Sequence, residues 1–256
     1  MKLIYANQFG EGKDLVIVHG FLGMGDNWKS LGKKWASSGY RVHLLDMRNH
    51  GRSFHDDYFS YDVMTEDIID YLEDQQIDKC YFIGHSMGGK VGMNLAIKKP
   101  DMLIKLVVVD IAPKFYPNHH GMILKGLELL EQNNLGSRKQ ADDLLSKTID
   151  EVGIRQFLLK NLYRDEDNQL HLRINLKALK KNIQNIGEAL ADGAVYNGKT
   201  LFLKGEKSTY ISNNDKRLIK KNFPNSDLKV VKNAGHWVHA EQPKIFYKSV
   251  NHFFNI

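Results

Sequence analysis

The sequence predicts a protein of the α/β class, with a mostly parallel central sheet that is flanked by helices and interrupted once by a helical insertion. Short apolar runs alternate along the chain with segments of helical spacing. The runs are apolar at nearly every position, which is typical of parallel strands covered by helices on both faces. The alternation stops over residues 113–195 and then resumes.

The composition is typical of a globular protein. The protein has 256 residues, of which 42% are hydrophobic and 26% are charged. These values exclude a disordered, collagen-like or fibrous chain. At roughly 150 residues per domain, the length fits one α/β unit with an insertion.

Six apolar runs are expected to form one buried sheet with right-handed crossovers. The segments between them carry apolar stripes at helical spacing, such as Met64, Ile68 and Leu72 and later Val91 and Leu95. The expected strands are Leu15–Val18, Val42–Leu45, Cys80–Ile83, Leu106–Val109, Thr200–Leu203 and Leu228–Val231.

The insertion divides the chain into three parts. We expect a core from residues 1–112, a helical cap from residues 113–195 and a second core part from residues 196–256. The cap leaves the chain after the fourth apolar run, at the carboxyl ends of the strands, where α/β folds bind ligands. We therefore expect it to cover that edge rather than to pack on the side of the sheet.

Several function classes are disfavoured. The 36 basic and 30 acidic residues give a net charge of 36 − 30 = +6, but the lysine pairs are scattered and no polybasic block occurs, so we expect no nucleic-acid partner. The most apolar stretch, Leu103–Ile111, contains Lys105 and Asp110, and Met1–Ala6 is too short for a signal peptide. The lone Cys80 permits a reducing compartment, so the expected location is cytoplasmic.

The strongest chemical motif is Gly84-His85-Ser86-Met87-Gly88-Gly89, which follows an apolar run and precedes a helical pattern. This is the setting that a G-x-S-x-G nucleophile elbow requires. Ser86 is the expected nucleophile, and the Met87 amide is one expected oxyanion donor. We expect the second donor to be the amide of Phe21, after the run that ends in Val18-His19-Gly20. His19 is expected to fix this loop rather than to act as a base.

The base and the acid must come from other strand ends. His236, after the last expected strand, is the predicted base, and His239 in the same loop is its rival. Chain order leaves Asp110, Glu206 and Asp215 as acids. Asp110 ends a buried strand, where an ionised group recovers its desolvation cost only through a partner. Glu206 follows the next strand and fits the same role.

Together these motifs resemble the α/β-hydrolase superfamily over essentially the whole chain. A narrower resemblance is to the YbfF-type esterases. It is carried by Asp26-Asn27-Trp28, Arg48-Asn49-His50-Gly51-Arg52-Ser53, the Ser86 elbow with Lys90, Val107-Val108-Val109-Asp110-Ile111-Ala112-Pro113 and Gly235-His236-Trp237-Val238-His239-Ala240-Glu241.

This resemblance implies a capped serine carboxylesterase that acts on small-molecule acyl esters, with acyl-CoA thioesters as a further class, and that needs no cofactor. Many superfamily members carry the acid in a Gly-x-x-Asp motif, but here Ser208 stands at the place of that aspartate. The YbfF-type pattern places the acid at Asp110, which favours Asp110 over Glu206.

The substrate-binding residues that we expect lie on the cap and around the catalytic loops. The cap stripe could face the sheet as an apolar acyl slot or simply form core. His119-His120 lacks acidic or cysteine partners, so no metal is expected, and Arg48–Ser53 is expected to shape the pocket floor. The residues expected to bind substrate are Leu22, His85, Phe157, Leu158 and Trp237, and the rest of the cap stripe is Leu159, Leu162 and Tyr163.

A serine at the elbow argues against epoxide hydrolases and dehalogenases, which use a carboxylate nucleophile. Carbon–carbon bond hydrolases, perhydrolases and lyase-type relatives keep the serine, and a non-catalytic receptor for a small ligand is an alternative of another class. Acyl length, leaving group and oligomeric state are open at the level of sequence.

Overall fold

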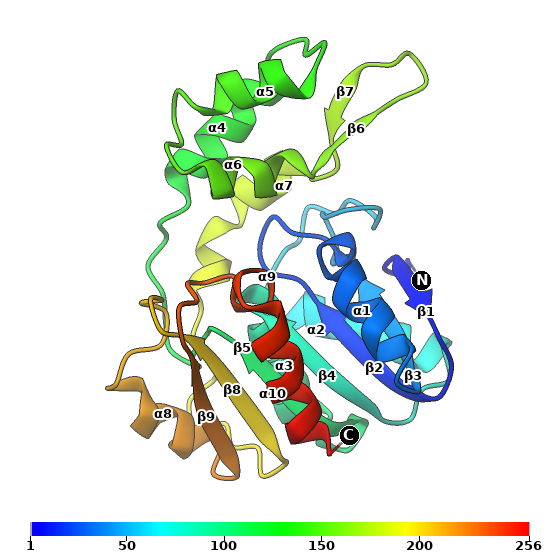
Figure 1. Cartoon of the computed structure of the whole chain (residues 1–256), viewed down its shortest axis with the longest axis vertical. Helices are drawn as coiled ribbons and strands as arrows, with labels where there is room; N and C mark the ends of the chain where they lie inside the picture. Colours follow the sequence, from blue (N-terminus) through cyan, green and yellow to red (C-terminus); the bar gives the residue numbers. More distant parts are fainter. Residues whose placement is uncertain (1, 256) are drawn as a thin grey trace.

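A computed structural model describes residues 2–255. Within this range the main sheet has seven strands in the order β1-β3-β2-β4-β5-β8-β9 (Figure 1). Every neighbouring pair is parallel except β1 with β3. The strands are β1 (Ala6–Phe9), β2 (Lys13–Val18), β3 (Tyr40–Leu45), β4 (Cys80–His85), β5 (Leu103–Val109), β8 (Thr200–Gly205) and β9 (Ser226–Val231).

All six predicted strands are present, and the predicted α/β class is confirmed. Strand β1 was not predicted, because its residues Ala6-Asn7-Gln8-Phe9 lack an apolar run and the strand lies at the edge of the sheet.

Helices cover both faces of the sheet, and the alternation of side chains along β2 explains why. Val16 and Val18 pack into one hydrophobic cluster, whereas Leu15 and Ile17 pack into the other. The first cluster is covered by α2 (Tyr61–Asp74), α3 (Met87–Lys98) and α8 (Asp215–Asn222). The second is covered by α1 (Lys29–Ala36) and α10 (Pro243–Phe254).

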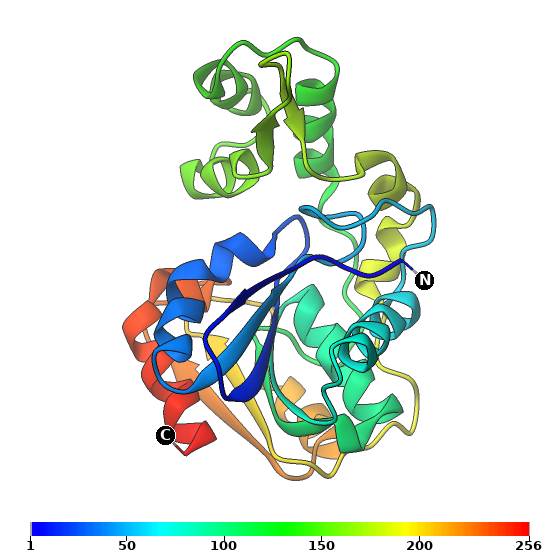
Figure 2. The same cartoon turned by 90° about the vertical axis from the view of Figure 1, so that its right-hand side faces the viewer.

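The insertion forms a separate group of elements beyond one end of the sheet (Figures 1 and 2). It contains α4 (Gly121–Glu131), α5 (Arg138–Leu145), α6 (Val152–Leu159) and α7 (Leu176–Lys181). Cap and core side chains line one cavity together, at the edge of the sheet that carries Ser86.

One expectation about the cap is wrong, because the insertion is not wholly helical. Strands β6 (Leu162–Arg164) and β7 (Leu170–Leu172) form an antiparallel hairpin, so Leu162 and Tyr163 lie on a strand. The polar turn between them is closed by the amide of Asp165, which donates to the carbonyl of Gln169, and Asn168 adopts a φ of 63°. Asparagine tolerates this left-handed conformation better than most residues do.

Four short helices complete the described chain: η1 (Gly25–Trp28), η2 (Pro100–Met102), η3 (Ile183–Gly187) and α9 (Val238–Glu241). No helix in residues 2–255 has both the length and the apolar character needed to cross a membrane.

Candidate active site

Ser86 lies at the sharp turn between β4 and α3, with φ 51° and ψ −113°. Its backbone is held by a 2.9 Å hydrogen bond from its amide to the carbonyl of Val109. A Cβ on Gly84 would overlap the carbonyl of Gly88, and a Cβ on Gly88 would overlap the carbonyl of Val18. The two glycines are therefore required by close backbone approach, as the elbow motif predicts.

Asp110 and His236 meet, although they lie 126 residues apart in the sequence. Asp110 follows β5, and His236 lies in the loop between β9 and α9. The Nδ1 atom of His236 is 2.8 Å from Oδ2 of Asp110. Because a carboxylate only accepts hydrogen bonds, Nδ1 carries the proton and Nε2 is left as an acceptor.

The other two candidate acids bind elsewhere. Glu206 accepts a 2.9 Å hydrogen bond from the amide of Asn233, and Asp215 forms an ion pair of 2.7 Å with Lys114. Neither contacts His236 in the described residues. Of the three, Asp110 is the one that the fold brings to the histidine.

His239, the rival base, is turned away from Asp110. Its ring stacks on Trp28 with centroids 3.9 Å apart, and it is buried. Burial, together with the nearby His236, lowers the pKa of His239 to about 3. His239 is therefore a neutral packing residue.

His85, expected to bind substrate, also contacts the loop that carries His236. Its Nε2 is 2.9 Å from the carbonyl oxygen of His236, to which it donates as a neutral ring. Burial and the neighbouring histidines hold the pKa of His85 well below its usual value. His85 thus ties the residue before the nucleophile to the loop of the predicted base.

Ser86 and His236 line the same cavity, which has a volume of about 520 Å³, but no hydrogen bond joins them within residues 2–255. Such bonds are often long in enzymes without substrate and shorten in the complex. His236 is also covered on one face by Tyr210, whose ring stacks on it at 3.8 Å.

The loop that carries Phe21 is held by two buried histidines. His19 donates from Nδ1 to the carbonyl of Gly20 at 2.8 Å and accepts at Nε2 from the amide of Met47 at 3.0 Å. This is the loop-fixing role expected for His19. His50 accepts at Nε2 from the amide of Leu22 at 3.1 Å.

The amides expected to bind the oxyanion, those of Phe21 and Met87, donate no hydrogen bond to another protein group in the described chain. Both residues line a pocket with Ser86. Burial lowers the pKa of His50 to about 3, so its acceptor nitrogen stays unprotonated and keeps the loop in place.

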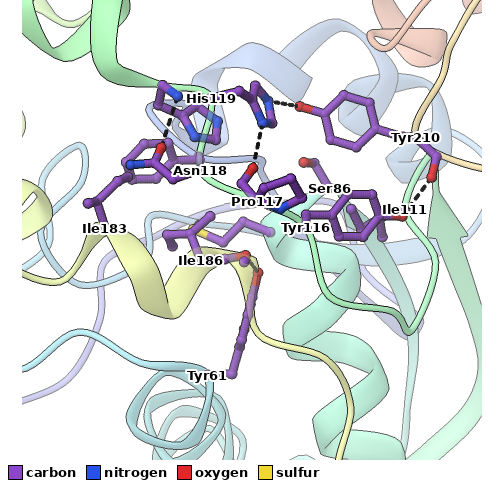
Figure 3. Close-up of a pocket in the computed structure, with 14 residues that line it drawn as sticks. Tyr61, Ser86, Ile111, Tyr116, Pro117, Asn118, His119, Ile183, Ile186 and Tyr210 are labelled. Carbon is purple, nitrogen blue, oxygen red and sulfur yellow. Dashed lines mark hydrogen bonds between the residues drawn. The ribbon is translucent and has the colours of Figure 1, made fainter.

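Ser86 lines two pockets. The wide cavity of about 520 Å³ is lined by all five residues expected to bind substrate. The side chains that line a second, narrow pocket of about 30 Å³ are drawn in Figure 3. Of the remaining stripe residues, Leu159 and Leu162 are buried in the hydrophobic core. The five lining residues are Leu22, His85, Phe157, Leu158 and Trp237.

Two residues of the site were not predicted from the sequence. The hydroxyl of Ser208 donates to Oδ2 of Asp110, and Tyr210 stacks on His236. The hydroxyl of Tyr210 lies 2.6 Å from Nε2 of His119, which, like His120, lines the pocket (Figure 3). The one signal in the sequence was Ser208 at the usual place of an aspartate.

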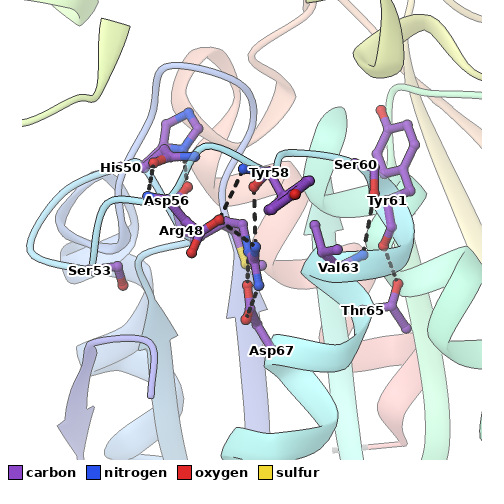
Figure 4. Close-up of polar contacts among 12 residues, drawn as sticks. Arg48, His50, Ser53, Asp56, Tyr58, Ser60, Tyr61, Val63, Thr65 and Asp67 are labelled. Carbon is purple, nitrogen blue, oxygen red and sulfur yellow. Dashed lines mark hydrogen bonds and ion pairs between the residues drawn. The ribbon is translucent and has the colours of Figure 1, made fainter. Parts of the chain in front are cut away.

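The Arg48–Ser53 loop holds itself together rather than presenting a free cation. The Arg48 guanidinium binds both carboxylate oxygens of Asp67, at 2.6 and 2.7 Å, and also donates to the carbonyl of Tyr58 (Figure 4). No residue of this loop lines either pocket beside Ser86, so the expectation that it shapes the pocket floor stays a prediction. No group of three or more metal-ligating side chains occurs in residues 2–255.

The family model described as alpha/beta hydrolase fold matches residues 14–243. The chain belongs to this family. A solved structure titled "Marine microorganism esterase" superposes with a TM-score of 0.93 at 39% identity, over 99% of this chain and 100% of that one.

Curated relatives point the same way. The chain is 38% identical to the sn-1-specific diacylglycerol lipase ABHD11 of Danio rerio, over 94% of this chain and 78% of that protein. It is 34% identical to Esterase YbfF of Escherichia coli, over 94% and 92% respectively. These relatives confirm the predicted likeness to YbfF-type esterases and the prediction of an ester hydrolase.

Proposed function

We propose that the protein is a serine carboxylesterase in which Ser86 is the nucleophile, His236 the general base and Asp110 the acid that orients the histidine. The observation that supports this most directly is the 2.8 Å hydrogen bond between Asp110 and His236 in a cavity that also contains Ser86. The esterase and lipase names of the relatives support acyl esters as substrates.

The reaction has two halves. Nε2 of His236 takes the Ser86 proton while the Ser86 oxygen bonds to the carbonyl carbon, and the carbonyl oxygen becomes an oxyanion. The amides of Phe21 and Met87 donate to that oxygen. The leaving alkoxide departs with the proton from His236, which leaves an acyl-serine.

Water then completes the cycle. His236 removes a proton from water, the resulting hydroxide attacks the acyl-serine, and the carboxylic acid leaves as Ser86 recovers its proton. The buried Asp110 stabilises the imidazolium that forms in both halves, because it is held next to Nδ1. No cofactor enters this scheme, and a cytoplasmic location for the enzyme is part of the proposal, supported by the single, buried Cys80.

Hydrolysis of p-nitrophenyl acetate tests the proposal. Ser86→Ala and His236→Ala are expected to lose at least about 10³-fold in kcat, and Asp110→Asn about 10³- to 10⁴-fold, because its histidine adopts the wrong tautomer. Glu206→Gln is the matched control and should keep wild-type turnover.

Two results contradict the proposal. Turnover that persists in folded Ser86→Ala rules out Ser86 as the nucleophile. If Glu206→Gln loses activity while Asp110→Asn retains it, the acid of the triad is Glu206 instead of Asp110. Circular dichroism and melting temperature confirm that each variant is folded.

A further inference from the structure

Lys90 is a fully buried lysine in the first turn of α3, four residues after Ser86. An ammonium group in the interior needs several partners to offset its lost hydration. Its Nζ donates to the carbonyl of Lys114 at 2.7 Å and to the carbonyl of Glu188. The rings of Tyr61 and Tyr116 lie 5.8 and 5.4 Å from Nζ, which is within the range of cation–π attraction.

Both carbonyls lie on the segments that join the cap to the core. Residues 113–120 run from β5 to α4, and residues 182–195 return from α7 to the core. These segments also bind each other: the Tyr116 amide donates to the Gly187 carbonyl at 2.8 Å, and the Leu190 amide donates to the Pro113 carbonyl at 2.9 Å. Lys90 therefore ties the nucleophile helix to both connections at once.

Stability alone does not explain a lysine at this position. Burial lowers the pKa of Lys90 to about 7, with the Glu188 carboxylate opposing the shift and Lys114 adding to it. A methionine would fill a similar volume without that cost, and exchanging buried ions for apolar groups is often neutral or stabilising. What a lysine adds is directional donors that fix the position of two separate carbonyls.

The fixed segments line the narrow pocket beside Ser86 (Figure 3). Tyr61, Tyr116, Ile186 and Gly187 all line it. The hydroxyl of Tyr61 donates to the Ile186 carbonyl at 2.8 Å. The pocket volume of about 30 Å³ admits roughly two to three groups the size of a water molecule.

The position of His236 assigns the two spaces to the two halves of an ester. The leaving group receives its proton from His236, so it must lie on that side of Ser86. His236 lines the wide cavity but not the narrow pocket. The acyl group then enters the narrow pocket, and the cap residues Phe157 and Leu158 face the leaving group.

We propose that Lys90 is a positioning residue that holds both connections of the cap and thereby restricts Ser86 to short acyl groups. This inference rests on the proposed esterase function. It assigns Lys90 a role in acyl selectivity that is separate from the proton transfers of His236.

The test compares kcat/KM for p-nitrophenyl acetate and p-nitrophenyl octanoate. Wild type is expected to prefer acetate by at least about 10-fold, the range that a poorly fitting apolar group costs in an enzyme pocket. In Lys90→Met the ratio of kcat/KM for acetate to kcat/KM for octanoate should fall by about 10-fold, mainly because kcat/KM for octanoate rises. Amide hydrogen exchange over residues 113–120 and 182–190 should become faster.

Lys105 offers a matched control. Its Nζ also donates to a backbone carbonyl, that of Phe253 at 2.8 Å, and lies 5.4 Å from an aromatic ring, but it is on β5 away from the pocket. Lys105→Met should keep the wild-type ratio. Lys90→Arg, which retains charge and donors, should move the ratio back toward wild type.

Tyr61→Phe keeps the inference testable if Lys90→Met does not fold. It removes the hydroxyl bound to Ile186 and should lower the acetate preference in the same direction. An unchanged ratio in folded Lys90→Met overturns the inference, as does an unchanged ratio in Tyr61→Phe where Lys90→Met does not fold, or a wild-type preference for octanoate. If Ser86→Ala retains hydrolysis, the proposed function fails instead, so the two failures are distinct.

Discussion

Asp110 accepts three hydrogen bonds on one buried carboxylate. Oδ1 accepts from the amide of Gly205 at 3.0 Å, while Oδ2 accepts from the hydroxyl of Ser208 and from His236. Hydrogen bonds to the ionised form stabilise a buried carboxylate and fix its direction. Ser208 therefore helps to aim Asp110 at His236, from the sequence position where other superfamily members carry the acid itself.

The Ser208→Ala variant tests this support. Removing one donor leaves Asp110 with two partners, so kcat for p-nitrophenyl acetate should fall by about 10-fold with little change in KM, since one hydrogen bond to a charged group contributes roughly 1.5–3 kcal/mol. Ser212→Ala, which removes a hydroxyl from the neighbouring carboxylate of Asp215, is the control and should keep full activity. A fall of equal size in both variants contradicts the assignment.

At the scale of elements, the elbow depends on how closely β4, α3 and β2 approach one another. The Gly84 backbone faces the carbonyl of Gly88, and Gly88 faces that of Val18. Any side chain at these positions must push the strand and the helix apart. The same contacts hold Ser86 in its positive-φ conformation at the edge of the sheet.

Gly84→Ala is expected to cost at least about 3 kcal/mol, the upper range for overpacking a rigid site. For a chain of this size that corresponds to a loss of roughly 6 °C or more in melting temperature. Gly153→Ala in α6 is the matched control, because an added Cβ there meets open space. Differential scanning calorimetry measures the melting temperature of each variant. Equal melting temperatures contradict the steric overlap expected at Gly84.

Across the whole molecule, the buried histidines and the half-buried His120 form a set that must remain neutral. His50 and His239 have their pKa lowered to about 3 and His120 to about 4, chiefly by burial. His19 and His85 are shifted in the same direction for the same reason. Each binds a proton more readily once the chain unfolds.

This predicts an acid-labile fold. Because the folded pKa lies below the unfolded value of about 6.5, stability is complete above that pH and is lost as pH falls toward the folded pKa. Each such histidine lowers the free energy of unfolding by up to about 1.4 kcal/mol per pH unit. The free energy of unfolding from urea denaturation should stay level between pH 7.5 and about 6.5 and then decline to pH 5, and His239→Gln should reduce the slope of that decline. A pH-independent midpoint contradicts the prediction.

The sequence by itself determined the features that depend on neighbours along the chain. Apolar runs predicted six strands, and the glycines around Ser86 predicted the elbow, because both follow from local packing and backbone sterics. The motif order also placed His236 after the last strand. The β6–β7 hairpin was not predicted, because strands of three residues are too short to show the alternation of apolar and polar residues.

Only the tertiary structure decided which groups meet across the chain. Asp110 and Glu206 both follow strands, and the choice between them depends on which carboxylate reaches a loop 126 residues beyond Asp110. In the sequence Lys90 is an ordinary helix residue. Only the fold brings the carbonyls of Lys114 and Glu188 within hydrogen-bond distance of its Nζ. Such contacts arise from the packing of distant segments, which local sequence patterns do not encode.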